Sequence, residues 1–268
     1  MQTLRGCPLV RYVPPSRPEQ QEQNATVALT WHPVVACLIS NPENVFCWLR
    51  HTGQMPIVVF AHRKGGVGKT LSCLYTGRWL ARAGFDVTLV DRDPQQGLLD
   101  IATALGCPDG RFTKRLRLSL DDALPIGRPG AWTLVDTPPA LDGSLPVLAE
   151  ADYLVIPVIP EIQEVAALEK FLSLLDGTRR ERPYLHTLGI LPVRYVHYWA
   201  NNRACLETIR HLGERYGYPV LDPVPWSQAV SRYSMAKGLW KHVADALIAK
   251  EPALLASSTT GKAVAHAA

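Results

Sequence analysis

Two lysines and three glycines lie between an apolar segment and a helix-like segment in VVFAHRKGGVGKTLSCLY, residues 58–75. Glycines let consecutive backbone N–H groups point into one cavity, and the N-terminus of the following helix adds positive potential. Lys69 could then reach the β- and γ-phosphates of a nucleotide, and the hydroxyl of Thr70 could ligate Mg²⁺. The expected phosphate-binding residues of this loop are Gly65, Gly66, Val67, Gly68, Lys69, Thr70 and Leu71.

Carboxylates follow two further apolar segments. Asp91 and Asp93 belong to VTLVDRDPQQG, residues 87–97, and Asp136 belongs to WTLVDTPPALD, residues 132–142. A carboxylate at the carboxyl end of a strand can hold Mg²⁺ through water or orient a water that attacks the γ-phosphate. An apolar strand that delivers a single aspartate predicts that Asp136 holds the metal. ATP and Mg²⁺ are the expected cofactors.

These residues need elements that bring them together, and from residue 56 the chain has a suitable pattern. Apolar runs of strand length alternate with segments of helix length, which predicts a doubly wound α/β fold with a mainly parallel sheet flanked by helices. Ligands of such sheets bind at the carboxyl ends of the strands. We expect strands at 57–61, 87–90, 133–135, 153–158 and 188–192, with a last short one near 220–224. We expect helices at 69–83, 162–175, 198–216 and 227–249, the second of them ended by Asp176-Gly177.

The two ends of the chain have a different composition. Residues 1–54 include the polar segment PPSRPEQQEQN, so we expect a poorly structured or disordered extension. Met55 directly precedes the first strand, so translation could start there; a genuine N-terminal arm is the alternative. We expect residues 55–250 to form the ATPase domain and 251–268 a flexible tail.

The composition excludes several classes of protein. No apolar run approaches the roughly 18–20 residues that span a bilayer, so we expect a cytoplasmic protein. The six cysteines are scattered without a CxxC pair, which favours reduced thiols over a zinc or iron–sulfur site.

The head of the phosphate loop departs from the standard pattern. Arg63 occupies the place of the usual glycine, five residues before Gly68, and Lys64 follows it. This additional lysine resembles the deviant Walker A motif of ParA, MinD and their relatives. The segments DRDPQ and DTPP resemble the switch I and switch II loops of the same family. Over roughly residues 56–245 the chain therefore resembles a ParA-type ATPase with a P-loop NTPase fold. About 43 residues separate Asp93 from Asp136, as in the compact plasmid-type members.

The resemblance implies roles for individual residues. Lys64 would reach across a nucleotide-sandwich homodimer to the phosphates bound by the partner, and Asp93 would orient the attacking water. Asp91 would hold the outer shell of the metal, beside the metal residues Thr70 and Asp136. Arg194, Pro225 and Trp226 would frame the adenine, although Arg194 could equally be a surface arginine.

The C-terminal third is more basic than the rest. Residues 179–241 contain ten arginines and lysines against four acidic residues. The resemblance implies an ATP-bound, nucleoid-associated dimer that binds non-specific DNA through this region, and a ParB-like partner that stimulates hydrolysis. The candidate DNA contacts are Arg203, Arg210, Arg215, Arg232 and Lys237. The alternative is that Arg203 and Arg210 form solvated helix pairs with Glu207 and Glu214.

The chain lacks the marks of two related classes. No cysteines are placed for the cluster of a nitrogenase iron protein, and GLWKHVADALIA, residues 238–249, has little positive charge opposite its apolar face. That segment predicts a helix packed on the core, without a membrane partner. DNA partition is the leading interpretation. Positioning of a protein cargo is the second, and an ATP-dependent metabolic ligase, which would not explain Lys64, is the third.

Overall fold

The computed structural model describes residues 56–119, 131–139, 147–148, 150–181, 185–234 and 238–251, without the side chains of 178–181 and 231. The predictions for residues 1–54 and for the tail after residue 251 lie outside these ranges.

Six parallel strands form the sheet, in the order β3-β2-β4-β1-β5-β6. They are β1 (Ile57–Phe60), β2 (Asp86–Asp91), β3 (Leu116–Ser119), β4 (Ala131–Asp136), β5 (Tyr153–Val158) and β6 (His186–Pro192). The chain leaves β1 toward one side of the sheet to reach β2, and adds β5 and β6 on the other side of β1. This confirms the predicted doubly wound α/β fold and puts the loop after β1 in the middle of the sheet's carboxyl edge.

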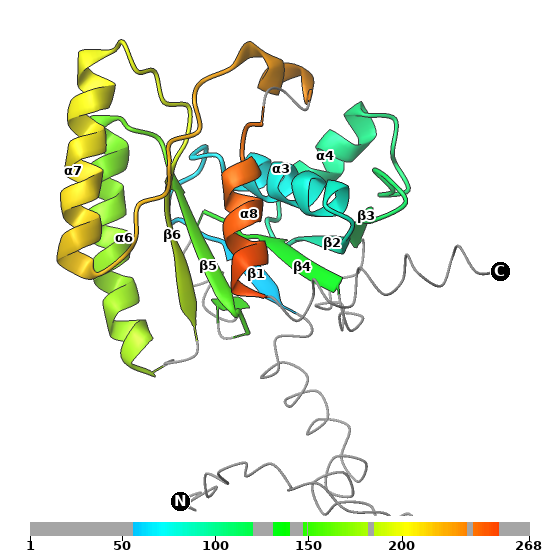
Figure 1. The fold of residues 1–268 in the computed structure, drawn as a ribbon, viewed down its shortest axis with the longest axis horizontal. Helices are drawn as coiled ribbons and strands as arrows, with labels where there is room; N and C mark the ends of the chain where they lie inside the picture. Colours follow the sequence, from blue (N-terminus) through cyan, green and yellow to red (C-terminus); the bar gives the residue numbers. More distant parts are fainter. Residues whose placement is uncertain are drawn as a thin grey trace, which may run out of the picture. The chain divides into compact units, whose positions relative to one another are not determined.

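Helices cover both faces of the sheet (Figure 1). One face carries α3 (Lys69–Arg82), α4 (Gly97–Ala104) and α8 (Lys241–Lys250), and the other carries α6 (Ile162–Glu181) and α7 (Ala200–Tyr216). Val58 and Phe60 of β1 belong to the first core, while Ile57 and Val59 belong to the second. Because successive side chains of a strand point to opposite faces, a strand buried on both faces must be apolar throughout.

Several predicted boundaries are wrong. The segment near 220–224 is not a strand, because Val220 and Pro225 form only isolated bridges, to Ile190 and Tyr195. Helix α6 continues through Asp176-Gly177 to Glu181, since a glycine inside a helix weakens it by only about 1 kcal/mol.

The predicted helix at 227–249 is two elements. The 3-10 helix η1 (Gln228–Arg232) ends at Tyr233, and α8 begins after Trp240. Tyr233, Gly238 and Trp240 have φ angles of 50°, 77° and 61°, which a continuous right-handed helix does not allow. The elements β3 and α4 were not predicted.

The apolar face of α8 packs on the core, as predicted, and the structure shows that it does so against α3. Val243 and Leu247 are fully buried, and the Trp240 ring stacks on Tyr75 with 4.6 Å between ring centroids. Trp240 Nε1 also donates a hydrogen bond of 2.9 Å to Ser72 Oγ. Within the described residues, no helix combines the length and the apolarity that crossing a membrane requires.

Candidate nucleotide site

The loop between β1 and α3 is built to receive an anion. Gly66 and Gly68 have φ angles of 75° and 91°, and Gly68 is the N-cap of α3 without a side-chain capping bond. The first backbone N–H groups of a helix have no partner within the helix, so this uncapped end presents donors where the loop ends and α3 begins. Lys69 Nζ donates a hydrogen bond of 3.1 Å to the carbonyl of Lys64, which closes the loop on itself.

Gly68 cannot be replaced without strain. Besides its positive φ, a Cβ atom there would lie 3.1 Å from Val193 Cγ2. We expect Gly68→Ala to lower the free energy of unfolding by about 1–3 kcal/mol, measured by urea unfolding. Gly177→Ala is the matched control, because Gly177 lies inside α6 with open space around it and should gain about 0.5–1 kcal/mol. Equal effects of the two substitutions would contradict this account of the loop.

Charged groups converge behind the loop. Lys69 is buried, and its burial lowers the pKa of the ammonium, an effect that the charges of Asp136 and Asp93 partly offset. Asp93 is half-buried, and its Oδ1 accepts the Gln95 N–H at 3.0 Å. The predicted catalytic aspartate thus lies within electrostatic reach of the phosphate-loop lysine.

Asp136 is the most buried carboxylate of this group. Its side chain is inaccessible to solvent, and burial raises its pKa to about 7. Asp136 Oδ2 accepts a hydrogen bond of 2.5 Å from Thr70 Oγ1, while Oδ1 is buried without a partner among the described residues. Asp91 pairs with Asp136 in the register of β2 and β4, and burial raises its pKa too. Its oxygens accept two backbone N–H groups, those of Asp93 and Leu98.

These three residues fit Mg²⁺. An unpartnered carboxylate oxygen beside a hydroxyl is a ligand set for a hard cation, and Mg²⁺ usually takes few protein ligands together with phosphate and water. In the described part of the chain, no group of three or more His, Cys, Asp and Glu side chains could hold a metal, and Cys73, Cys107 and Cys205 are free thiols. The predicted metal residues Thr70, Asp91 and Asp136 therefore lie together and would hold the ion with help from the nucleotide.

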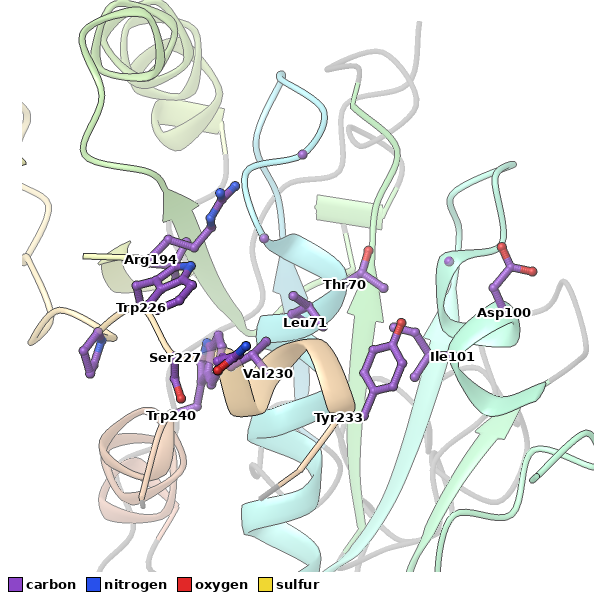
Figure 2. Close-up of a pocket in the computed structure, with 16 residues that line it drawn as sticks. Thr70, Leu71, Asp100, Ile101, Arg194, Trp226, Ser227, Val230, Tyr233 and Trp240 are labelled. Carbon is purple, nitrogen blue, oxygen red and sulfur yellow. The ribbon is translucent and has the colours of Figure 1, made fainter. Parts of the chain in front are cut away.

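A pocket of about 580 Å³ opens beside the phosphate loop (Figure 2). The predicted adenine residues Arg194, Pro225 and Trp226 line it together with Leu71. Arg194 has a positive φ of 57°, an uncommon conformation for a residue with a side chain, and the large Trp226 side chain is 55% exposed. Trp226 N–H donates a hydrogen bond of 2.8 Å to the Tyr195 carbonyl. This bond links the segment that contains Arg194 to the segment that contains Trp226.

Part of the pocket was missed by the sequence interpretation. Its far side consists of α4, η1 and the start of α8: Gly97, Asp100, Ile101, Ser227, Gln228, Val230, Tyr233 and Trp240. The segment WSQAVSRY next to the predicted adenine residues was a usable signal for the η1 part. The sequence of α4 carries no recognisable N-cap that would have predicted a helix there.

The candidate DNA contacts differ in whether their side chains already have a partner within the protein. Arg210 pairs with Glu207, and Arg215 pairs with Glu169 of α6. Arg203 donates a hydrogen bond of 3.0 Å to the His197 carbonyl, so the pair suggested for it with Glu207 is wrong. The pair suggested for Arg210 with Glu214 is also wrong, because Arg210 contacts Glu207 instead.

Further basic side chains lie on the surface of the protein. Arg232 is exposed, and Lys237 lies outside the described residues. A second basic group, which the sequence interpretation did not weigh, surrounds β3: Arg111, Lys114, Arg115 and Arg117, all exposed.

Comparison with known proteins adds independent information. The family model described as the CobQ/CobB/MinD/ParA nucleotide binding domain matches residues 58–239. The maintenance of carboxysome distribution protein A of Halothiobacillus neapolitanus is 29% identical, with 67% of this chain and 83% of that protein covered. The chromosome-partitioning ATPase Soj of Thermus thermophilus is 30% identical, with 52% of this chain and 69% of that protein covered.

Two solved structures have a similar fold. Cobyrinic acid a,c-diamide synthase of Mycobacterium smegmatis, with a bound ATP analogue and magnesium, has a TM-score of 0.57 at 22% identity; the match covers 72% of this chain and 94% of that one. A plasmid partition protein of Borrelia burgdorferi has a TM-score of 0.53 at 17% identity, over 74% of this chain and 99% of that one. At these identities the likeness concerns the fold alone.

Proposed function

Because the chain belongs to the CobQ/CobB/MinD/ParA nucleotide-binding family and is an ATPase with ATP and Mg²⁺ as cofactors, we propose that it is a DNA-partition ATPase. ATP closes a homodimer, the dimer binds non-specific DNA of the nucleoid, and a ParB-like partner stimulates hydrolysis and release. ATP favours DNA binding because it favours the competent dimer.

The observation that carries this proposal is the second lysine of the phosphate loop. Lys69 is buried and directed to its own loop, whereas the Lys64 side chain at the head of the loop is 38% exposed. Lys69 therefore serves the nucleotide of its own loop, whereas the half-exposed Lys64 is the lysine that a second protomer can approach. A cation supplied from a partner stabilises the charge of phosphoryl transfer, so hydrolysis depends on assembly.

Within the site, each residue has one task. Lys69 and the N–H groups of the loop would bind the β- and γ-phosphates, while Thr70 and Asp136 would hold Mg²⁺, which would supply positive charge to the phosphates. Asp93 orients the attacking water, and Lys64 of one protomer contacts the phosphates bound by the other. Arg194 and Trp226 hold the base.

DNA binding tests the proposal. Wild-type protein should bind a labelled non-specific duplex only with Mg-ATP, and the affinity should fall steeply as salt rises, because Lys and Arg replace counterions on phosphates. Asp93→Ala should bind ATP without hydrolysing it, and should therefore dissociate from DNA more slowly than the wild type. The measurement is fluorescence anisotropy over a salt series.

The basic surface can be located in the same assay. Replacing Arg203 and Arg232 by glutamine should weaken binding about equally for all sequences and lower the salt slope by about 2. The matched control neutralises Lys114 and Arg117 at β3 and should leave both quantities unchanged. If ATP is hydrolysed but no DNA is bound with any nucleotide, DNA partition is excluded.

A protein cargo is the second candidate. The observation that favours it is the likeness to the carboxysome-distribution protein, which covers more of this chain than the likeness to Soj does. A metabolic ligase, as the cobyrinic acid synthase neighbour would suggest, leaves the additional lysine of the loop, Lys64, without a role in the reaction.

A further inference from the structure

Lys64 has a partner inside its own protomer. Its Nζ forms an ion pair with Oε1 of Glu164, a residue one hundred positions later in the chain, in the first turn of α6. The Glu164 side chain is only 11% exposed, and its second oxygen, Oε2, is buried without a partner among the described residues. The ion pair therefore joins a half-exposed lysine to a nearly buried carboxylate.

The position of Glu164 in its helix does not account for this arrangement. A carboxylate in the first turn of a helix is stabilised by the helix dipole, but that effect works equally well for an exposed side chain. Burial of a carboxylate is unfavourable unless a cation compensates it, and Lys64 is the cation that contacts Glu164. The ion pair thus fixes the positions of both side chains. The position of the Lys64 ammonium matters for hydrolysis, because this ammonium is the proposed contact to the partner's nucleotide.

Both lysines of the loop are held within the protomer in this structure. Lys69 Nζ contacts the Lys64 carbonyl at 3.1 Å, and Lys64 Nζ contacts Glu164. A phosphate bound in the loop would replace the Lys64 carbonyl as the partner of Lys69 Nζ, because Lys69 belongs to the same loop. In this pair the Lys64 ammonium donates to a carboxylate of its own protomer rather than to a phosphate.

We propose that Glu164 is a positioning residue that holds Lys64 on its own protomer, and that the Lys64–Glu164 ion pair must open before Lys64 contacts a nucleotide bound by a second copy of this chain. This inference rests on the proposed ATP-driven dimer. Opening the pair leaves a nearly buried carboxylate without its cation, so Glu164 opposes dimerisation until ATP phosphates in the partner offer more negative charge. The ion pair thereby raises the protein concentration at which ATP-bound protomers dimerise and hydrolyse ATP.

Sedimentation velocity with Mg²⁺ and the non-hydrolysable analogue AMPPNP tests this, without DNA. Glu164→Gln keeps the shape of the side chain but removes the charge, so it should dimerise at about tenfold lower protein concentration than the wild type. Its ATP turnover should also become half-maximal at about tenfold lower protein concentration. Glu169→Gln is the matched control, because it removes an exposed carboxylate from the same helix and should match the wild type in both assays.

Two further measurements separate positioning from a structural role. The double variant Lys64→Ala/Glu164→Gln should behave as Lys64→Ala does, since Glu164 acts through Lys64. AMPPNP affinity of the single protomer should be the same in Glu164→Gln and the wild type, whereas a damaged loop would weaken it.

The possible failures are distinct. If the wild type dimerises with AMPPNP and Glu164→Gln dimerises equally or less, Glu164 does not restrain Lys64, and the proposed function stands. If Glu164→Gln lowers turnover with dimerisation unchanged, Glu164 supports Lys64 in the dimer, and the restraint is again excluded. If no nucleotide makes the wild type dimerise, the inference and the proposed function are both overturned.

Discussion

At pH 8, without nucleotide or Mg²⁺, Asp136→Asn is expected to be more stable than the wild type by on the order of 3 kcal/mol. Burial raises the pKa of Asp136 to about 7, so at pH 8 the wild type carries an ionised carboxylate in a place where the neutral form is favoured. Asparagine has nearly the same shape and no charge. The same substitution should abolish Mg²⁺-dependent hydrolysis, because the metal needs the carboxylate.

The pH dependence follows from the sign of the shift. Between about pH 4 and 7 the folded protein holds a proton on Asp136 that the unfolded chain has lost, so the contribution of Asp136 to stability declines as pH rises through this window. The advantage of Asp136→Asn should therefore be small near pH 4 and reach its full size above pH 7.

Urea unfolding at several pH values in EDTA measures this difference. The control is Asp245→Asn, whose carboxylate is about half exposed in an ion pair with Lys241 and should change stability by less than about 1 kcal/mol. A destabilising effect of Asp136→Asn at pH 8 would contradict the account, because it would mean that the ionised carboxylate stabilises the empty site.

Lys69→Ala and Lys64→Ala are expected to fail in different ways. Lys69 lies in the protomer's own loop, so its loss should weaken Mg-ATP binding by about 10- to 100-fold, measured by titration calorimetry. Lys64→Ala should bind ATP within about threefold of the wild type. Its turnover should nevertheless fall by at least about 100-fold, because a cation supplied from the partner stabilises the transferring phosphoryl group.

Lys170→Ala, an exposed lysine of α6, is the control for both measurements. The decisive comparison is between the two loop lysines. If Lys64→Ala loses ATP binding as severely as Lys69→Ala does, Lys64 acts on the nucleotide of its own protomer and the role in the partner's site is wrong.

The sequence predicted the fold where local pattern decides structure. Strands β1, β4 and β5 lie between helix layers, so burial on both faces makes them continuous apolar runs that are easy to recognise. Strand β3 lies at the edge of the sheet with only four residues, and Arg117 interrupts its apolar pattern. Helix α4 has eight residues and starts after Gln96 in a left-handed conformation, without a recognisable cap.

The candidate site divides in the same way. The loop glycines, Lys69 and the aspartates could be predicted because each follows a recognisable strand. The Lys64–Glu164 pair and the η1 side of the pocket could not, because they depend on how α6 and the segment after β6 return to the loop. Tertiary contacts between residues one hundred positions apart leave no periodic trace in a single sequence.

The most direct test of the central claim, an ATP-driven dimer, is the mass of the wild-type protein in solution. Sedimentation velocity should give a monomer without nucleotide and with Mg-ADP, and a dimer with Mg-AMPPNP. Lys64→Ala should remain largely monomeric in all three conditions while it still binds the analogue. A wild-type protein that binds Mg-AMPPNP and stays monomeric up to high protein concentration would contradict the account.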